Sequence, residues 1–246
     1  MSRVLILGAT SAIAGEVAQI LAARGDRLHL VGRNPDKLAR LVATLPTGCC
    51  SQEAADLADL PANAGVVDRA LAALGGLDLV LIAHGDLGNQ LVSERDLAEA
   101  DRIVTVNLRS PISLLVPIAN HLEAAGQGRI AVITSVAAER GRPRNYTYGA
   151  AKGALNTYLQ GLRTRLRPTG VGVTTIKLGP VATPMTEGHD RHLLFATAPG
   201  VARRIVDAID RGADVVFVPG WWAWIMPVVR HLPEAVFQRL AVLSGR

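Results

Sequence analysis

The sequence is short of cysteine, aromatic residues and lysine, and the first two shortages limit what the protein can be. Its two cysteines, Cys49 and Cys50, are adjacent, which is poor geometry for a structural disulfide, and two are too few for a disulfide scaffold. Aromatic residues make up 4% of the chain while 49% of its residues are hydrophobic, so aliphatic side chains and alanine must build the core. We therefore expect reduced thiols in a cytosolic protein of one large domain.

Clusters of basic residues are missing too, although the chain carries a net charge of +5. The arginines are scattered, so we expect no nucleic-acid partner and attribute the charge to attraction for anionic substrates or membrane surfaces. No signal peptide is expected, because MSRVLILGAT reads directly as a strand and a glycine turn. We expect no metal site, and we place the protein in the cytoplasm, either free or peripheral at the inner face of the membrane.

Short apolar runs alternate with longer helical patterns along the chain. Buried strands are predicted at 3–8, 27–32, 77–83, 129–135, 171–178 and 214–219, with a weaker one at 48–52. Helical periodicity occurs at 12–24, 62–74, 94–124, 146–167 and 199–211. This alternation predicts a doubly wound α/β fold, with a parallel sheet covered on both faces and a ligand site at the carboxyl ends of its strands. The aperiodic segment 183–198 is interpreted as a lid over that site.

The first strand leads into a turn, LILGATSAIAGEVA, that suits a phosphate. Gly8 ends the strand and Ser11 can cap the next helix, whose N-terminus favours an anion. After the second strand no acidic residue is present to hold a ribose hydroxyl, and Arg33 stands where a 2′-phosphate would be met. If a dinucleotide binds, we therefore expect NADP(H) rather than NAD(H). A solvated arginine is the alternative interpretation of Arg33.

The stretch RNYTYGAAKGAL places Tyr148 four residues before Lys152, one of only three lysines. On a helix these two side chains share a face. Unit charges about 4 Å apart at an effective dielectric constant near 20 interact by roughly 4 kcal/mol, which would lower a tyrosine pKa by about 3 units, into the range for acid–base catalysis. Ordinary helix packing is the alternative, because this spacing also arises by chance.

Other polar residues strengthen the catalytic interpretation. Ser135 follows Thr134 at the carboxyl end of a predicted strand, where a hydroxyl can bond a substrate oxygen. Asn107 lies inside a predicted helix that also contains Pro111. An asparagine in mid-helix is usually only tolerated, but beside a proline it can mark a distorted turn that binds a water.

In order and spacing, Gly8, Asn107, Ser135, Tyr148 and Lys152 resemble the short-chain dehydrogenase/reductase family. The resemblance covers residues 3–218 and implies a Rossmann fold with a seven-stranded parallel sheet. By this resemblance Tyr148 would be the general acid in carbonyl reduction. Lys152 would lower the pKa of Tyr148 and bind the nicotinamide ribose. Ser135 would hold the substrate oxygen, and Asn107 would hold a water in the proton relay.

The same resemblance implies the cofactor contacts. Asp56 and Leu57 would contact the adenine, and Val181 and Thr183 would meet the nicotinamide amide. The remaining expected contacts are Gly8, Thr10, Ser11, Ala12, Ile13, Arg33, Ala83, His84, Gly85, Tyr148 and Lys152. Residues 1–219 would form the dinucleotide-binding catalytic domain, and residues 220–246 an extension packed on the domain, a partner subunit or a membrane surface.

The chain departs from the usual family pattern at a few positions. Ala12 and Ala14 replace the later glycines of the first turn, and we expect binding to survive with a shifted phosphate. His84 stands in IAHG where the family usually has Asn-Asn-Ala-Gly, close to the expected cofactor path; a structural histidine is the alternative to a direct role. Leu178 replaces the proline usual before Gly179.

All three tryptophans lie in residues 221–224, and no charged residue occurs from Val215 to Val229. Fifteen residues are too few to span a bilayer, but tryptophan favours the membrane interface. Together with IAHG and ERGRPRNYTYG, this tail resembles one subgroup of the family, the keto-reductase partners of decaprenylphosphoryl-ribose 2-epimerase pairs. That subgroup reduces a keto sugar carried on a polyprenyl phosphate. Packing of the tail on its own domain or on a second subunit is the alternative.

Three hypotheses follow for the function. The first is an NADP(H)-dependent oxidoreductase that reduces a ketone, such as a lipid-linked keto sugar, to an alcohol. The second is a soluble reductase of small ketones or 3-oxoacyl groups. The third is a dinucleotide-binding sensor or scaffold without turnover, against which the intact catalytic set argues. By the family resemblance we expect a homodimer or homotetramer that assembles through the helix starting near Tyr146.

Overall fold

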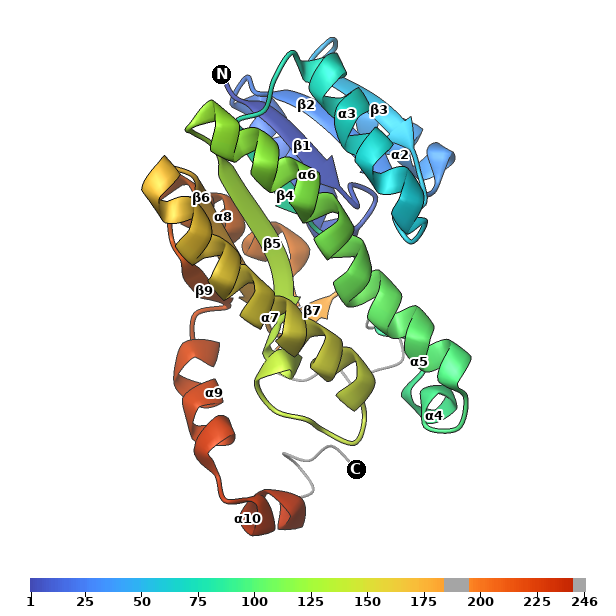
Figure 1. Cartoon of the computed structure of the whole chain (residues 1–246), viewed down its shortest axis with the longest axis vertical. Coiled ribbons are helices and arrows are strands. Elements are labelled where there is room, and N and C mark those ends of the chain that lie inside the picture. The colour runs from blue at the N-terminus through green and yellow to red at the C-terminus, as the bar shows by residue number, and fades with distance from the viewer. Residues whose placement is uncertain (184–194, 241–246) are drawn as a thin grey trace.

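The computed structural model describes residues 1–183 and 195–240, and a parallel sheet of seven strands lies at its centre (Figure 1). The strands are β1 (Arg3–Leu7), β2 (Arg27–Gly32), β3 (Cys50–Ala54), β4 (Leu79–Ile82), β5 (Arg129–Ser135), β6 (Gly172–Leu178) and β9 (Val215–Val218). Their order across the sheet is β3-β2-β1-β4-β5-β6-β9. The doubly wound α/β fold is confirmed, and the weak strand expected at 48–52 is present at 50–54.

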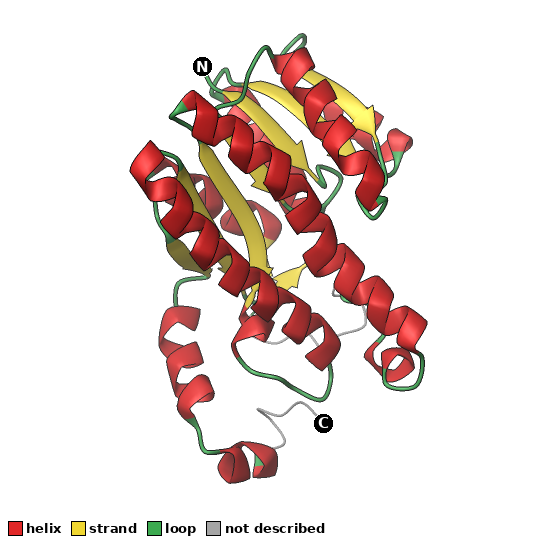
Figure 2. Cartoon of the chain, in the orientation of Figure 1, coloured by secondary structure: helices red, strands yellow, loops and turns green. Residues whose placement is uncertain are grey.

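Successive side chains of a strand point to opposite faces of the sheet, so continuous apolar runs fill two cores. In β1, Val4 and Ile6 belong to one core while Leu5 and Leu7 belong to the other, and all four are fully buried. The first core is covered by α1 (Ala12–Ala23), α2 (Pro35–Val42) and α8 (Ala198–Asp210). The second is covered by α3 (Asn63–Leu74), α6 (Ser110–Ala125) and α7 (Tyr146–Leu166), so helices cover both faces (Figure 2).

The segment predicted as one helix over 94–124 is helical from Leu97 to Ala125, and a separate short helix precedes it. Asn89 caps a short helix, α4 (Gln90–Ser93), and Asp96 caps α5 (Leu97–Val104) by accepting a hydrogen bond from the backbone N–H of Ala98. A π-helix follows at Thr105–Arg109 and runs directly into α6. The helix thus begins three residues later than the predicted start at 94, because Asp96 caps it there.

The chain after β9 forms two helices for which periodicity gave no prediction, α9 (Trp222–His231) and α10 (Glu234–Arg239). The short elements are β7 (Val181–Ala182), which pairs with β8 (Ala196–Thr197), and the 3-10 turns η1 (Leu60–Ala62), η3 (Val136–Glu139) and η4 (Arg167–Thr169). Most of the lid expected at 183–198 lies outside the described residues. At the carboxyl end of β5, η3 contacts both the start of α7 and α9, so these three elements lie at the same edge of the sheet (Figure 1).

One helical stretch, Leu97–Ala125, is long and apolar enough to cross a membrane by length and composition. Its apolar side chains instead face the second core, where Leu114, Leu115 and Ile118 are fully buried. The stretch is therefore a core helix of the α/β domain.

Replacement of Leu115 by alanine tests this packing. The truncation leaves a cavity beneath α6, so Leu115→Ala should lower the free energy of unfolding by about 2–5 kcal/mol in a denaturant titration. The adjacent Val116 is 48% exposed, and Val116→Ala should change that free energy by no more than about 0.5 kcal/mol. Equal effects of the two substitutions would show that this face of α6 is not in the core.

Candidate active site

Ser135, Tyr148 and Lys152 meet at the carboxyl end of β5. Ser135 is the last residue of that strand, and its hydroxyl lies beside the Tyr148 phenol, donates to the backbone oxygen of Leu178 at 3.4 Å and accepts from the backbone N–H of Ala137 at 3.1 Å. Tyr148 lies in the first turn of α7, and Lys152 follows one turn later. The Lys152 ammonium lies 5.9 Å from the centre of the phenol ring, and it donates to the backbone oxygen of Ile133 at 3.4 Å. The helix predicted to place both side chains on one face is present.

Asn107 reaches the same region from the π-helix. Its side chain is fully buried, and its amide nitrogen donates to the backbone oxygens of Asp86 at 2.6 Å and Ile103 at 2.9 Å. Its side-chain oxygen accepts from the backbone N–H of Asp86 at 3.2 Å. The distorted helical turn considered from the sequence is thus present, and it fixes Asn107 against the loop after β4.

Gly85 shows how closely these groups converge. A Cβ atom at this position would lie 2.9 Å from the Asn107 side-chain oxygen and 3.2 Å from the Lys152 ammonium. Any larger residue would collide with at least one of them. The end of β4, the π-helix and α7 therefore approach within one small space, and Gly85 keeps that space open.

Burial controls the ionisation of the cluster. It raises the pKa of Tyr148 to about 12, and the hydrogen bond with Ser135 offsets only part of that effect. Burial also lowers the pKa of Lys152 to about 8. The expected lowering of the Tyr148 pKa by Lys152 is therefore not found, because desolvation of the phenol outweighs an ammonium that lies 5.9 Å from the ring centre. At neutral pH the phenol is protonated and the amine is mostly charged.

The first turn is shaped to receive a phosphate. Gly8 has a φ of +84°, and a Cβ there would lie 2.6 Å from the backbone nitrogen of His84, so only glycine fits. Ser11 caps α1 by accepting from the backbone N–H of Ala14 at 3.2 Å, and the first turn of α1 leaves N–H groups outside the helix ladder. Ala14 is fully buried in the core while Ala12 is exposed, so both departures from glycine fit the turn without a clash.

The other expected cofactor residues surround this edge of the sheet. Thr10 and Ile13 flank the turn, and Ala83 follows β4 with its backbone N–H bonded to the Leu7 oxygen at 2.8 Å. Arg33 is exposed directly after β2. Asp56 and Leu57 lie on the loop after β3, Val181 begins β7 and Thr183 follows it, and Leu57 and Val181 are buried. Their contacts with a cofactor remain predictions.

Two comparisons of sequence agree with this geometry. A family model described as short chain dehydrogenase matches residues 2–193. An uncharacterized oxidoreductase of Mycobacterium tuberculosis is 35% identical over 240 residues, which cover 96% of each chain. This chain belongs to the short-chain dehydrogenase/reductase family. It is an NAD(P)-dependent oxidoreductase, and its family acts on small-molecule carbonyl substrates.

Solved structures resemble this short-chain dehydrogenase/reductase in fold. The crystal structure of levodione reductase matches it with a TM-score of 0.81 and 23% identity, covering 90% of this chain and 97% of that one. A structure of ElxO with NADP bound also matches with a TM-score of 0.81, at 18% identity, covering 91% of this chain and all of the other. At these identities the likeness concerns the fold.

His84 has a defined place in the reductase. Its Nε2 lies 2.8 Å from the Ser110 hydroxyl, which itself donates to the backbone oxygen of Leu57 at 2.5 Å. Since the Ser110 proton is used on Leu57, His84 must donate from Nε2, which leaves Nδ1 as a buried acceptor without a described partner. Burial, with a smaller contribution from Lys152, lowers the pKa of His84 to about 3, so the imidazole is neutral. The bond to Ser110 supports a structural role for His84, while its contact with a cofactor stays a prediction; nothing in the sequence near His84 signals that Ser110 is its partner.

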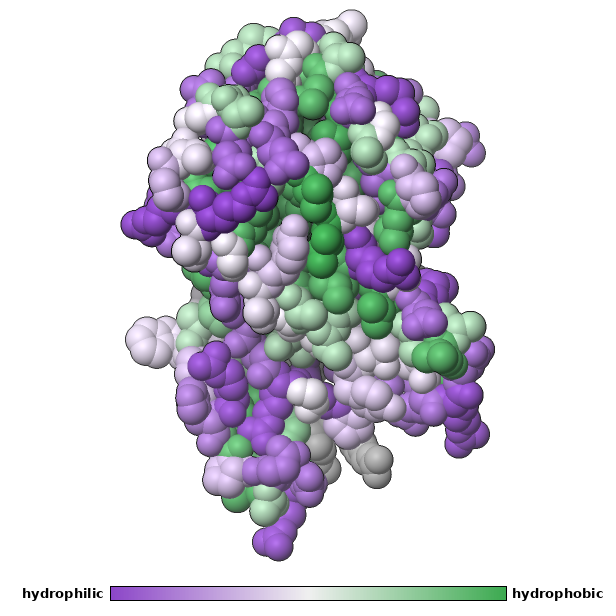
Figure 3. Space-filling model, in the orientation of Figure 1, coloured by the Kyte–Doolittle hydropathy of each residue, from purple (hydrophilic) through white to green (hydrophobic). Residues whose placement is uncertain are grey.

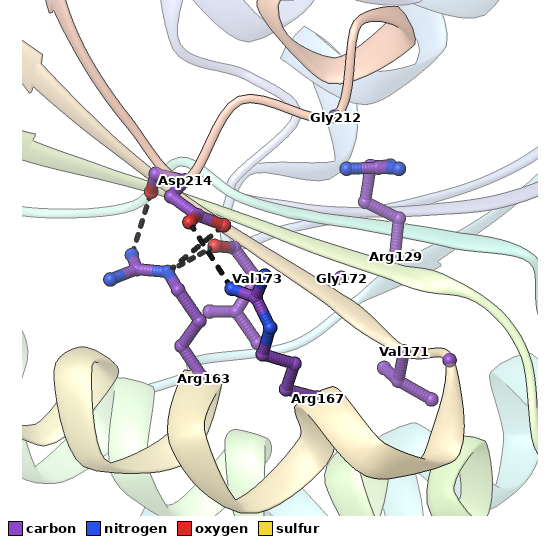
Figure 4. Close-up of a pocket in the computed structure, with 9 residues that line it drawn as sticks. Arg129, Arg163, Arg167, Val171, Gly172, Val173, Gly212 and Asp214 are labelled. Carbon is purple, nitrogen blue, oxygen red and sulfur yellow. Dashed lines mark hydrogen bonds and ion pairs between the residues drawn. The ribbon is translucent and has the colours of Figure 1, made fainter.

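A separate hollow lies at the opposite edge of the sheet. Its lining includes Arg129, Arg163 and Arg167, and Asp214 faces the last two within ion-pair distance (Figure 4). Arg163 also donates to the backbone oxygens of Val173 and Asp214, so its guanidinium holds β6 and the start of β9 together. This hollow lies away from the catalytic cluster. Within residues 1–183 and 195–240, no group of three or more His, Cys, Asp or Glu side chains is placed to hold a metal.

The neutral state of His84 makes the protein sensitive to acid. The unfolded chain binds the histidine proton near pH 6.5 and the folded chain only near pH 3, so this contribution to stability is lost as the pH falls from about 6.5 toward 3. At pH 5 the loss should be up to about 2 kcal/mol. His84→Gln keeps a donor for Ser110 but cannot be protonated, so its unfolding free energy should fall less steeply between pH 7 and 5.

Denaturant titrations at several pH values measure how the unfolding free energy of wild type and of His84→Gln changes with pH. The exposed His231→Gln controls for the substitution itself and should keep the wild-type slope. Equal slopes for wild type and His84→Gln would contradict a neutral buried imidazole.

Proposed function

We propose that this enzyme reduces a ketone to an alcohol with NADPH as the reductant. The observation that carries this proposal is the convergence of the Ser135 hydroxyl, the Tyr148 phenol and the Lys152 ammonium, with Asn107 and Lys152 closing on Gly85. A proton donor, a hydroxyl that can hold a carbonyl oxygen and a fixed cation are the groups that carbonyl reduction requires. A binding protein without turnover has no use for a buried phenol held this way.

Each residue has a defined part in the proposed reaction. Gly8, the N-terminus of α1 and Lys152 would hold a nicotinamide cofactor, which would supply a hydride for the carbonyl carbon. Ser135 holds the carbonyl oxygen, and Tyr148 donates its proton to that oxygen, so that the ketone becomes an alcohol. The phenolate that results lies near the Lys152 ammonium, which stabilises its negative charge. Asn107 holds the loop after β4 in position and, by the family pattern, a water through which the proton is replaced.

The preference for NADP(H) over NAD(H) rests on Arg33. This guanidinium is exposed after β2, and it forms no ion pair within residues 1–183 and 195–240. It is therefore available for a 2′-phosphate, with Gly8 and the N-terminus of α1 available for the pyrophosphate. The bound NADP in the structurally similar ElxO supports the same preference.

For the substrate we propose a keto sugar on a polyprenyl phosphate, as in the subgroup that the tail resembles. The net charge of +5 and the tryptophan-rich segment 221–224 both suit an amphiphilic anionic substrate. Reduction of a small ketone is the second candidate, which the fold likeness to levodione reductase favours. In either case the reacting group is a carbonyl beside Ser135 and Tyr148.

We also propose how the molecule is arranged in the cell. Residues 1–219 form the catalytic domain, and residues 220–246 form an extension that works at the inner face of the membrane, in the cytoplasm. A homodimer or homotetramer would assemble through α7, on the face where Tyr146 of α7 and Val116 of the neighbouring α6 are exposed. Apolar side chains form a band along α6 on this face (Figure 3).

Removal of one hydroxyl tests the proton donor. Tyr148→Phe should lower kcat for NADPH-dependent ketone reduction at least 100-fold, because general acid catalysis contributes roughly 10²–10⁴-fold. Fluorescence titration should show NADPH affinity within about threefold of wild type. Tyr146→Phe, at an exposed tyrosine two residues earlier, is the matched control and should keep full activity. A Tyr148→Phe enzyme with most of its wild-type kcat would refute the mechanism.

Cofactor preference is tested at Arg33. A charge-assisted hydrogen bond contributes about 1.5–3 kcal/mol, so Arg33→Ala should weaken NADPH binding roughly 10- to 100-fold and leave NADH binding unchanged. Side-by-side fluorescence titrations measure both affinities. The exposed Arg40→Ala, in the following helix, is the matched control and should alter neither. Equal NADPH and NADH affinities in the wild type would remove Arg33 from the cofactor site.

A further inference from the structure

Helix α9 is apolar on both of its faces, although only one face is covered by the described residues. Trp221, Trp224 and Val228 recur at helical spacing from its cap onward and are 43%, 82% and 64% exposed. On the opposite side Trp222, Met226 and Val229 are buried. A surface helix normally turns polar residues outward, so an apolar outer face indicates a surface that something covers.

The inner face of α9 packs against the catalytic edge of the sheet. Trp222, Met226 and Val229 form a small core with Val136 and Phe217. Val136 directly follows Ser135, and the Trp222 indole fills the space beside Gly179, which follows β6. The helix therefore contacts the residues that flank the proposed active site.

Polar contacts hold the same segment from η3. Arg140 donates to the backbone oxygens of Val229 at 2.8 Å and Leu232 at 2.6 Å, pairs with Glu234 and lies 4.1 Å from the centre of the Phe237 ring. Glu139, paired at 2.5 Å with Lys177, also faces Arg230 at 3.8 Å. The anchoring of α9 and α10 thus uses their inward groups and leaves the outer face of α9 free of these contacts.

The charges around the outer face are positive. No acidic residue occurs between Asp214 and Glu234, while Arg230 and His231 end α9 on exposed positions. The Arg230 side chain is 60% exposed, since its contact with Glu139 is long. Tryptophan side chains prefer the headgroup region of a bilayer, and nearby cations are attracted to anionic lipids.

We propose that the outer face of α9, formed by Trp221, Trp224 and Val228, is a docking surface for an anionic lipid bilayer, with the exposed Arg230 in the last turn of the helix as a nearby cation. This inference deepens the proposed function, on which it rests, by naming the surface through which the enzyme meets a membrane-borne substrate. Because the inner face of the same helix contacts Val136 and Gly179, a bilayer bound to α9 lies close to the substrate-holding Ser135. A polyprenyl-linked ketone would then reach the site without leaving the membrane.

Vesicle binding of the full-length protein tests the surface directly. Wild type should sediment with vesicles of phosphatidylcholine containing 30% phosphatidylglycerol and not with pure phosphatidylcholine, and salt should weaken the binding. Its tryptophan emission should shift to shorter wavelength on binding. The double variant Trp224→Ser/Val228→Ser should bind the anionic vesicles at least tenfold more weakly, because two exposed apolar side chains no longer enter the interface.

A matched control uses apolar residues that are equally exposed elsewhere. Leu91 and Leu97 are 75% and 74% exposed on α4 and α5, which lie across the molecule from α9 (Figure 1), and Leu91→Ser/Leu97→Ser should bind vesicles like wild type. Absence of wild-type binding, or equal loss in both double variants, would overturn the proposal. So would light scattering that shows Trp224→Ser/Val228→Ser to dissociate an oligomer, because the occupant would then be a second copy.

The reductase assay remains separate from this result. Tyr148→Phe leaves α9 intact and should bind the vesicles like wild type. If the protein binds vesicles but Tyr148→Phe keeps its activity, the reductase mechanism fails and the docking surface stands. If the protein reduces ketones but does not bind vesicles, only the docking surface is refuted.

Discussion

The site depends on burying a lysine ammonium that pairs with no carboxylate of residues 1–183 and 195–240. Lys152 is 3% exposed, burial alone accounts for its lowered pKa, and its hydrogen bond to the Ile133 oxygen is long at 3.4 Å. A buried cation without a counter-ion is costly, and the cost is reduced by whatever negative charge develops beside it. The phenolate that forms when Tyr148 gives up its proton is such a charge. The unpaired cation thus favours the state in which the proton has left, while burial keeps the resting phenol protonated.

The same cation shapes its neighbours. It contributes to the low pKa of His84, whose neutral ring can then donate to Ser110 and connect the end of β4 with the Leu57 oxygen. This connection joins the loop expected to hold adenine with the strand end that carries Gly85. Buried polar groups therefore link the catalytic cluster with the loop expected to hold adenine, through the Nε2–H group that His84 donates to Ser110.

Local sequence patterns were sufficient to predict the sheet and the helix that carries Tyr148 and Lys152. They were insufficient to predict contacts between segments that are far apart in the sequence. Continuous apolar runs such as RIAVITS are constrained on both faces, so they predict buried parallel strands closely. The helix predicted over 94–124 begins only at Leu97, because the Asp96 side chain caps it there, and periodicity does not detect such caps. The predicted direction of the Tyr148 pKa shift was wrong, because the spacing of charged residues can be read from a sequence and the burial of the phenol cannot. Likewise, nothing near Arg140 in the sequence signals that its partners lie about 90 residues later.

The departures from the usual family pattern make sense once each side chain is placed. Ala14 faces the core beneath α1, and the His84 imidazole turns toward Ser110 in α6. Neither displaces the Ser135 hydroxyl, the Tyr148 phenol or Gly85, which the convergence of β4, the π-helix and α7 restricts to glycine. Ala14 and His84 thus differ from the usual pattern at positions where the side chain points into the protein, whereas at Gly85 three elements leave no room for another atom. Steric crowding around Gly85 therefore limits which residues can form the catalytic cluster. The features that distinguish this chain from the usual family pattern are the residues packed next to that cluster and the helices that follow β9.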